Sequence, residues 1–451
     1  MDVTRSLARY VVDATYESLP AEVIHEAKRS LLNWMGVAIG GCRHEAVEIA
    51  LATVAEFSGP PRASVLGRTE RLDILHAALI NGMSSHVFDF DDTHLATVIH
   101  PSGPVAPGLL AIAETRPVSG KDLLLAFVLG VEVECRIGRA VYPSHYDQGW
   151  HITATAGVFG AAAAAGKLLR LTEQQMVHAL GIAATQAAGL REMFGTHCKP
   201  FHPGRAAQNG LLSALLAARG FNSSTQGIEG RRGFANVMAA EHNLAEITDG
   251  LGDRFEILFN TYKPFACGIV IHPAIDGCIQ LRNEYGLTAD QIERIDLRVN
   301  PLVLELTGKR APQVGLEGKF SVYHSVAVAI IDGAAGEAQY SDSRVADPAV
   351  VALRERVTAT ADPGMPKDAC YVAITLADGR VLERYVPHAV GSLERPMTDD
   401  ELDAKFRALV APILPANQTE ELIRLCRSLE QLPDSAALVE KGVPRTEEGR
   451  T

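Results

Sequence analysis

The feature that most constrains this chain is a long run of helical periodicity before about residue 260, followed by a shorter stretch of strand-like alternation. In residues 20–41 apolar side chains recur every three to four positions, and a pair of glycines ends the run. Residues 121–140 are apolar nearly all round, as expected of a helix buried on several sides. No convincing strand pair precedes residue 260. This part of the chain is therefore expected to pack helix on helix.

Two further helices are expected between residues 154 and 189. The stretch 154–169 is dominated by alanine and glycine, which lets neighbouring helices approach closely. Thr172 and Gln175 form a capping-box pattern at the start of the next helix.

The second part of the chain changes character. Residues 294–306 alternate and are rich in branched side chains, and residues 370–386 form two strand-like runs around an Asp-Gly turn. Residues 323–335 have helical spacing, and amphipathic helices return in 398–414 and 420–432.

A chain of 451 residues is too long for one hydrophobic core, so at least two domains are expected. The fold class is predicted to be mostly α with an α+β part. A large all-α helical domain, residues 1–262 plus 395–451, would be interrupted by a smaller α+β lid domain, residues 263–394.

Composition excludes several functional classes. The net charge of -12 disfavours a nucleic-acid partner, because no basic stripe is present to neutralise phosphates. No stretch approaches ~18 uninterrupted apolar residues, so no membrane association is expected. The seven cysteines are scattered without a Cys-x-x-Cys pair, which suits a reducing compartment and argues against an iron–sulfur cluster. A cytoplasmic protein is expected, since the first residues carry no secretory signal.

Polar clusters interrupt the apolar sequence at five places. The first, residues 86–105, holds three aspartates and three histidines. The others are rich in histidine, lysine and aspartate, and they centre on His145 to His151, His197 to Arg205, Lys263 to His272, and Lys319 to His324. Any one of them, lying beside Pro and Gly, is more often a solvated loop. Five of one kind favour a functional site.

Metal binding is the first specific interpretation of these clusters. The sequence has no zinc-type His-x-x-x-His or Cys/His spacing, no His-Asp dipeptide, and no fifth-position aspartate after Asp91-Asp92, where Leu95 stands. We therefore predict no metal and no cofactor. The alternative is acid–base chemistry on an anionic substrate, in which lysines bind carboxylates and a histidine transfers a proton.

Six motifs together resemble the MmgE/PrpD family over about residues 5–440. They are FDFDDTH with HPSGPV, GWHITATAGVFGAAAAAGKLLRL, ALGIAATQAAGL, KPFHPGRAAQNG, GIEGRRGF and YKPFACGIVIH. The resemblance implies a helical domain with a smaller α+β lid, a homodimer and no iron–sulfur cluster. Known members include 2-methylcitrate dehydratases, cis-aconitate decarboxylases and iminodisuccinate epimerases.

The resemblance also implies a set of site residues. Its catalytic positions fall on Asp89, His100, His151, Lys199 and His272, and its substrate-binding positions on Thr93, Lys263, Tyr323 and His324. His100 and His151 would transfer protons, while Lys199 and His272 bind carboxylate and developing charge. The remaining members of the first cluster, among them His86, Asp91, Asp92 and His94, are interpreted as capping or packing groups.

The activity implied first is a cofactor-free hydro-lyase of the 2-methylcitrate dehydratase type. The alternatives are an epimerase of a small dicarboxylate, a cis-aconitate decarboxylase, or a silent helical scaffold. Two departures count against the decarboxylase: the Tyr323-His324 order, and one extra residue between Thr93 and His100.

Overall fold

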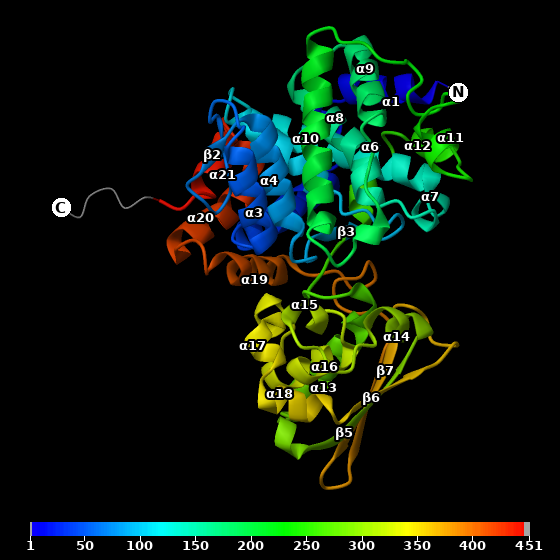
Figure 1. Cartoon of the computed structure of the whole chain (residues 1–451), viewed down its shortest axis with the longest axis vertical. Helices are drawn as coiled ribbons and strands as arrows, with labels where there is room; N and C mark the ends of the chain where they lie inside the picture. Colours follow the sequence, from blue (N-terminus) through cyan, green and yellow to red (C-terminus); the bar gives the residue numbers. More distant parts are fainter. Residues whose placement is uncertain (1, 446–451) are drawn as a thin grey trace, which may run out of the picture. The chain divides into compact units, whose positions relative to one another are not determined.

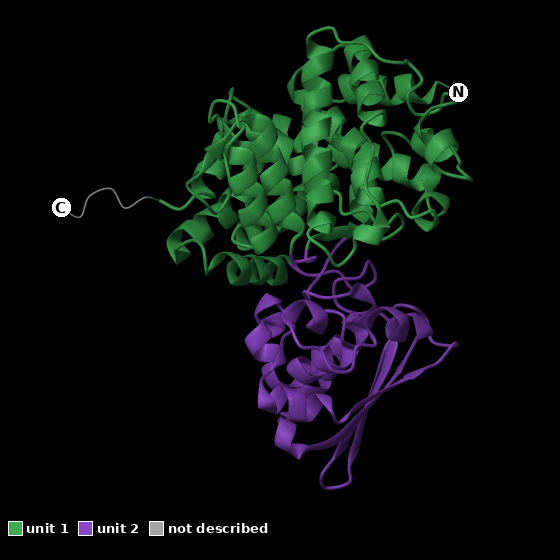
Figure 2. Ribbon diagram, in the orientation of Figure 1, with its two compact units in different colours: residues 1–87, 91–260, 399–451 green, residues 88–90, 261–398 purple. Residues whose placement is uncertain are grey.

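The computed structural model describes residues 2–445, which form two compact units (Figure 2). Unit 1 comprises residues up to 87, 91–260 and 399 onward, and unit 2 comprises residues 88–90 and 261–398. The fold class predicted from the sequence is confirmed: the protein is mostly α with an α+β part. Residues 88–90 group with unit 2, although the chain on both sides of them belongs to unit 1.

Unit 1 is built from helices (Figure 1). They are α1 Val3–Asp13, α2 Ala21–Gly41, α3 Glu45–Ala55, α4 Ile74–His86, α5 Ser102–Ala113, α6 Gly120–Val141, α7 Ser144–Asp147, α8 Ile152–Leu168, α9 Glu173–Ala184, α10 Cys198–Ala218, α11 Phe234–Met238, α12 Ala245–Thr248, α19 Asp399–Val410, α20 Ala416–Arg427 and α21 Ala436–Lys441. Short strands are β1 Ala63–Ser64, β2 Arg71–Leu72 and β3 Asp92–His94. The antiparallel β1–β2 pair is a strand pair that the periodicity missed, because each strand has only two residues.

The core of unit 1 lies around α8, which packs against α6, α5 and α10. Small residues set these distances. A Cβ on Gly130 of α6 would lie 3.0 Å from the carbonyl oxygen of Gly160 of α8, and a Cβ on Gly160 would lie 2.7 Å from the carbonyl oxygen of Gly130. The expected capping box at Thr172 and Gln175 is present at the start of α9. The alanine-rich stretch therefore acts as a close-packing surface.

Unit 2 combines a four-stranded sheet with helices (Figure 1). The sheet order is β6-β5-β7-β8, with β5 parallel to β6 and antiparallel to β7. Its elements are α13 His272–Tyr285, β5 Ile292–Val299, α14 Pro301–Thr307, α15 Gly315–Gly318, α16 Val322–Asp332, α17 Asp342–Val345, α18 Pro348–Arg354, β6 Val357–Ala361, β7 Cys370–Leu376 and β8 Val381–Val386; β4 Asn260–Tyr262 lies at the unit boundary. Helices α13 and α16 pack on the sheet.

The strand expected over residues 294–306 is wrong in its second half. The strand ends at Val299, and α14 begins two residues later. The Asn300 side chain accepts a hydrogen bond from the Leu302 amide, and Pro301 occupies the first helical position. The hairpin at Asp378-Gly379 is confirmed, with Gly379 at a left-handed φ of 88°.

Among residues 2–445, none of the helices has both the length and the apolar character needed to cross a bilayer.

Candidate functional site

Four buried histidines of unit 1 come together at helix ends, and we call His86, His100, His151 and His202 the histidine cluster. His86 is the last residue of α4, and His151 immediately precedes α8. His100 lies two residues before α5, and His202 lies in the second turn of α10. The ring centroids of His86 and His100 are 4.8 Å apart, those of His86 and His151 are 5.9 Å apart, and those of His151 and His202 are 5.1 Å apart.

One carboxylate connects two of these rings. Asp91 is fully buried, and one of its oxygens lies 2.6 Å from His86 Nδ1. Its other oxygen lies 3.2 Å from His100 Nδ1. Asp91 therefore bridges His86 and His100, and both rings offer it the same nitrogen.

The surroundings of His100 define which of its nitrogens carries the proton. Nδ1 lies 2.8 Å from the main-chain oxygen of Asp92 and 3.3 Å from the Thr93 hydroxyl, in addition to Asp91. The carbonyl and the carboxylate can only accept, so Nδ1 is the donor of the neutral ring and Nε2 holds the lone pair. The Thr153 hydroxyl fixes the backbone by accepting from the His100 amide at 3.2 Å.

A second pair of histidines stands beside a cationic lysine. His151 Nδ1 and His202 Nδ1 are 2.9 Å apart, so one must donate and the other accept. The Phe194 ring lies edge-on to His151, with centroids 4.9 Å apart. Lys199 is half-buried, and its ammonium lies 5.5 Å from the centre of the Phe194 ring. The second and third polar clusters of the sequence thus meet in unit 1.

Burial and neighbouring cations keep these imidazoles neutral. Burial lowers the pKa of His86 to about 4, despite the opposing attraction of Asp91. Burial, and then electrostatic interaction with His86 and Lys199, lower the pKa of His151 well below its ordinary value. Burial and Lys199 lower the pKa of His202 as well. His86, His151 and His202 therefore offer unprotonated nitrogens near neutral pH, with Lys199 nearby, a combination suited to binding an anion and accepting a proton.

Three buried carboxyl groups near the cluster have pKa values shifted in different directions. Burial alone would raise the pKa of Asp91, but His100 and His86 together hold it well below its ordinary value. Burial raises the pKa of Asp92 to about 6, against the hydrogen bonds it accepts from Ser102 Oγ at 2.5 Å and Asn260 Nδ2 at 2.7 Å.

Glu134 of α6 is fully buried, and neither of its oxygens has a hydrogen-bond partner among the described residues. Burial and then Asp92 raise its pKa far above the ordinary value, so Glu134 stays protonated.

Unit 2 holds two buried lysines against residues 88–90. Lys263 Nζ donates to the main-chain oxygen of Asp89 at 2.8 Å and to its Oδ1 at 2.9 Å. Lys319 Nζ donates to the main-chain oxygen of Phe88 at 2.9 Å and to Glu337 at 2.7 Å. Residues 88–90 are therefore fixed to unit 2 by two ammonium groups.

The other predicted residues of unit 2 occupy packed positions. His272 begins α13, and its ring stands edge-on to Phe265, with centroids 5.2 Å apart. The Tyr323 ring stacks under the Arg310 guanidinium at 4.7 Å. His324 Nε2 meets the main-chain oxygen of Gln339 at 2.9 Å. These contacts leave the predicted roles of the three residues untested.

The predicted site residues are divided between the two units. Unit 1 contains Thr93, His100, His151 and Lys199, and unit 2 contains Asp89, Lys263, His272, Tyr323 and His324. His86 and Asp91, interpreted from the sequence as capping or packing groups, both lie against His100: the His86 ring packs edge-on to it, and Asp91 lies 3.2 Å from its Nδ1. His202 was also missed as a site residue. Its sequence signal was the short His197-to-Arg205 cluster, which contains Lys199.

The geometry of one trio would also permit a metal ion. His86, Asp91 and His100 each offer one ligand atom, and these atoms lie within 4.8 Å of one another. Two imidazoles and a carboxylate suit several divalent metals. The sequence pattern did not predict this arrangement, since the spacing 86, 91 and 100 matches no common metal motif.

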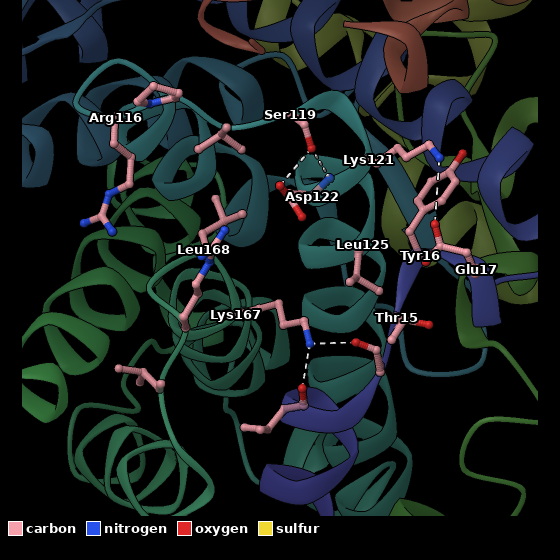
Figure 3. A pocket seen from close by; sticks show the side chains of 16 residues that line it. Thr15, Tyr16, Glu17, Arg116, Ser119, Lys121, Asp122, Leu125, Lys167 and Leu168 are labelled. Atoms are coloured by element: carbon pink, nitrogen blue, oxygen red, sulfur yellow. Dashed lines mark hydrogen bonds and ion pairs between the residues drawn. The ribbon is translucent and has the colours of Figure 1, made fainter. Parts of the chain in front are cut away.

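A separate hollow on unit 1 is built around the segment after α1 (Figure 3). Its volume is about 770 Å³, and its lining includes Tyr16, Lys121 and Lys167. Lys167 Nζ is already bonded to the main-chain oxygens of Val12 and Ala14, at 2.8 Å and 2.7 Å. Lys121 lies 3.8 Å from Glu17 and 5.0 Å from the centre of the Tyr16 ring. Both lysines of the hollow thus have protein partners, and no residue of the histidine cluster lines it.

The sequence matches two family models that together cover most of the chain. The MmgE/PrpD N-terminal domain matches residues 5–247, and the MmgE/PrpD C-terminal domain matches residues 265–431.

The curated relatives of this chain include cis-aconitate decarboxylases and 2-methylcitrate dehydratases. The chain is 30% identical to the cis-aconitate decarboxylase of Homo sapiens, over 97% of this chain and 93% of the relative. It is 28% identical to the cis-aconitate decarboxylase of Aspergillus terreus, over 97% of this chain and 95% of the relative. It is 25% identical to the 2-methylcitrate dehydratase of Cupriavidus necator, over 92% of this chain and 91% of the relative.

Proposed function

Because this chain belongs to the MmgE/PrpD family, we propose that it is a lyase acting next to a carboxylate of a small di- or tricarboxylic acid, with decarboxylation of cis-aconitate as the preferred reaction. The observation that carries the proposal is the histidine cluster of unit 1, where neutral imidazoles stand beside Lys199. Proton transfer next to a carboxylate needs such a pair of functions: a cation for the anion and a base or acid for the proton.

The choice of decarboxylation over dehydration rests on the relatives. Similarity to the decarboxylases is higher in identity and in coverage than similarity to the dehydratases. The dehydratase expected from the motifs is therefore the second candidate. The two departures that counted against the decarboxylase, at Tyr323 and before His100, concern single contacts, whereas the similarity extends over 97% of the chain.

The proposed chemistry assigns functions to residues already described. Lys199 binds a substrate carboxylate through a charge-assisted contact. Loss of CO2 leaves the electron pair of the broken C–C bond on the remaining skeleton, where cationic groups stabilise it. A protonated imidazole then delivers a proton to carbon. His100 and His151 are the proposed carriers, and the negative charge of a bound carboxylate favours their protonated forms.

Thr93 of unit 1 and five residues of unit 2 complete the proposal. We assign Asp89, His272, Thr93, Lys263, Tyr323 and His324 to substrate binding or to orienting the reacting groups, as the family resemblance implies. A homodimer is part of the same proposal.

Proton NMR of the purified protein in deuterated buffer tests the reaction. Incubation with cis-aconitate is expected to release CO2 and give a product with one deuterium on carbon. A new alkene from 2-methylcitrate, without CO2, would indicate the dehydratase instead. Deuterium exchange into recovered iminodisuccinate, without net loss, would indicate an epimerase.

Variants connect the reaction to the site. His100→Gln and Lys199→Met are expected to lower turnover by at least about 10²-fold, in the range typical of lost acid–base catalysis. His76→Gln is the matched control, because His76 forms a 2.6 Å contact with Asp73 at the opposite end of α4. Unchanged turnover in both site variants would place the reaction elsewhere.

A further inference from the structure

Two histidines of the cluster share one carboxylate, and this arrangement goes beyond the residues assigned above. Asp91 Oδ2 accepts from His86 Nδ1 at 2.6 Å, whereas Asp91 Oδ1 lies 3.2 Å from His100 Nδ1 in an ion-pair contact without hydrogen-bond geometry. The side chains of His86 and Asp91 have no exposed surface. The three groups form a continuous chain of contacts from the end of α4 to the start of α5.

Only one of the two ring nitrogens of His86 has a hydrogen-bond partner among the described residues. Its Nδ1 serves Asp91, while its Nε2 is buried without a hydrogen-bond partner among the described residues. A buried nitrogen without a hydrogen-bond partner lowers the stability of the folded state. An apolar side chain could fill the same space without leaving a nitrogen unpaired, and replacing a buried polar pair by apolar residues is often neutral for stability. Space filling alone therefore does not explain a histidine at this position.

We infer that Asp91 and His86 are positioning residues of the proposed active site: Asp91 fixes His100 in the tautomer with Nδ1 protonated and Nε2 free, and His86 holds Asp91 in place through its Nδ1–H. The inference rests on the proposed function, because His100 is the group that it prepares for proton transfer. Asp91 itself contacts no reacting atom in this arrangement.

The assignment follows from the number of acceptors around Asp91 and His100. Nδ1 of His100 faces the Asp92 carbonyl, the Asp91 carboxylate and the Thr93 hydroxyl. Without Asp91 the Asp92 carbonyl remains as the strict acceptor at 2.8 Å, but the negative charge that further favours a proton on Nδ1 is lost. A carboxylate held by a second donor cannot turn away from His100, which gives His86 its function.

Nitrogen-15 NMR of protein labelled at histidine tests the geometry without any substrate. Near neutral pH the wild-type protein is expected to show His86 and His100 as Nδ1–H tautomers, assigned with His86→Gln and His100→Gln variants. In Asp91→Asn the amide can accept from one ring only, and its own N–H faces the other. At least one of the two rings is then expected to change tautomer. A wild-type His100 protonated at Nε2 would overturn the inference.

Kinetics separate positioning from packing. Asp91→Asn is expected to lower kcat on the order of 10³-fold with KM changed less than about threefold, by analogy with loss of the orienting carboxylate in other histidine–carboxylate pairs. His86→Leu removes the donor and is expected to lower kcat, whereas His86→Gln keeps an N–H donor and is expected to recover most of it. Equal kcat in these two His86 variants would overturn the role of His86.

A control variant and a metal analysis complete the test. His76→Gln breaks a histidine–aspartate pair of the same 2.6 Å length at the start of α4, and it is expected to leave kcat unchanged. A bound divalent metal at one equivalent, lost in Asp91→Asn, would overturn the inference, since Nδ1 would then carry the metal in place of a proton. If none of the three substrates reacts, the proposed function fails, but the NMR result still decides the geometry.

Discussion

Lys263 holds Asp89 at two points, through its main-chain oxygen at 2.8 Å and its Oδ1 at 2.9 Å. Asp89 has a φ of 53°, in the left-handed region that non-glycine residues seldom adopt. The lysine thus bonds both the backbone and the side chain of a strained residue. Aspartate is among the residues that tolerate this conformation best, and the two bonds from Lys263 hold Asp89 in it.

Removal of this ammonium is expected to weaken unit 2. Lys263→Met eliminates both bonds to Asp89, and the predicted loss in the free energy of unfolding is about 1–3 kcal/mol, since Asp89 keeps some access to water. The measurement is urea denaturation. Lys309→Met, which removes an exposed ion pair with Glu317, is the control and is expected to cost about 0–1 kcal/mol. Equal losses in the two variants would contradict the prediction.

Close helix packing next to the cluster is expected to be sensitive to one methyl group. A Cβ on Gly204 of α10 would lie 2.3 Å from the main-chain oxygen of Leu79 of α4. Gly204→Ala is therefore predicted to destabilise by about 1–3 kcal/mol and to lower turnover, because α10 also carries Lys199 and His202. Gly108→Ala is the control: its nearest neighbour would lie at 3.7 Å, and about 0.5–1 kcal/mol of stabilisation is expected in a helix interior.

The buried acid Glu134 is expected to make the protein less stable as pH rises. Its pKa is raised in the folded state, so the unfolded chain releases the proton first, and stability falls once pH exceeds the unfolded value of about 4.3. Glu134→Gln cannot ionise. Between pH 4 and pH 8 the Tm of Glu134→Gln is predicted to rise relative to the Tm of the wild type. A difference independent of pH, like that expected for exposed Glu355→Gln, would refute it.

The His151–His202 pair is expected to make stability fall in acid. Both groups have a lowered pKa in the folded state, so the unfolded chain binds protons first as pH drops below about 6.5. The contribution is complete above that pH and is lost as pH falls toward the depressed values. His202→Gln is predicted to flatten the decline of Tm between pH 6.5 and pH 5, and exposed His242→Gln is predicted to leave its slope unchanged.

The sequence allowed the helices and the main histidines to be predicted, for different physical reasons. Helices such as α2 and α8 follow from a local period of apolar residues. His100 and His151 were identified through motifs. Strand β6 was missed, because its five residues alternate too briefly to be distinguished from a loop.

The network around Asp91 could not be predicted from local patterns. Its partner His86 ends α4 and His100 lies two residues before α5, and the segment between them contains left-handed residues at Asp89 and Val98. The partnership of His151 with His202 spans 51 positions and depends on how α8 and α10 pack. Such contacts arise from tertiary structure, which residue spacing alone does not encode.

The helix starts around the cluster have a consequence for long-range attraction. Helices α5, α8 and α10 begin at Ser102, Ile152 and Cys198, so three amino-terminal ends with partial positive charge lie beside His100, His151 and Lys199, against one carboxyl-terminal end at His86. An anion entering there meets a local field opposite in sign to the net charge of -12 of the whole chain. Because buried backbone dipoles are screened less than exposed charges, added salt should weaken the long-range repulsion of a polyanion by the net charge more than it weakens this local attraction.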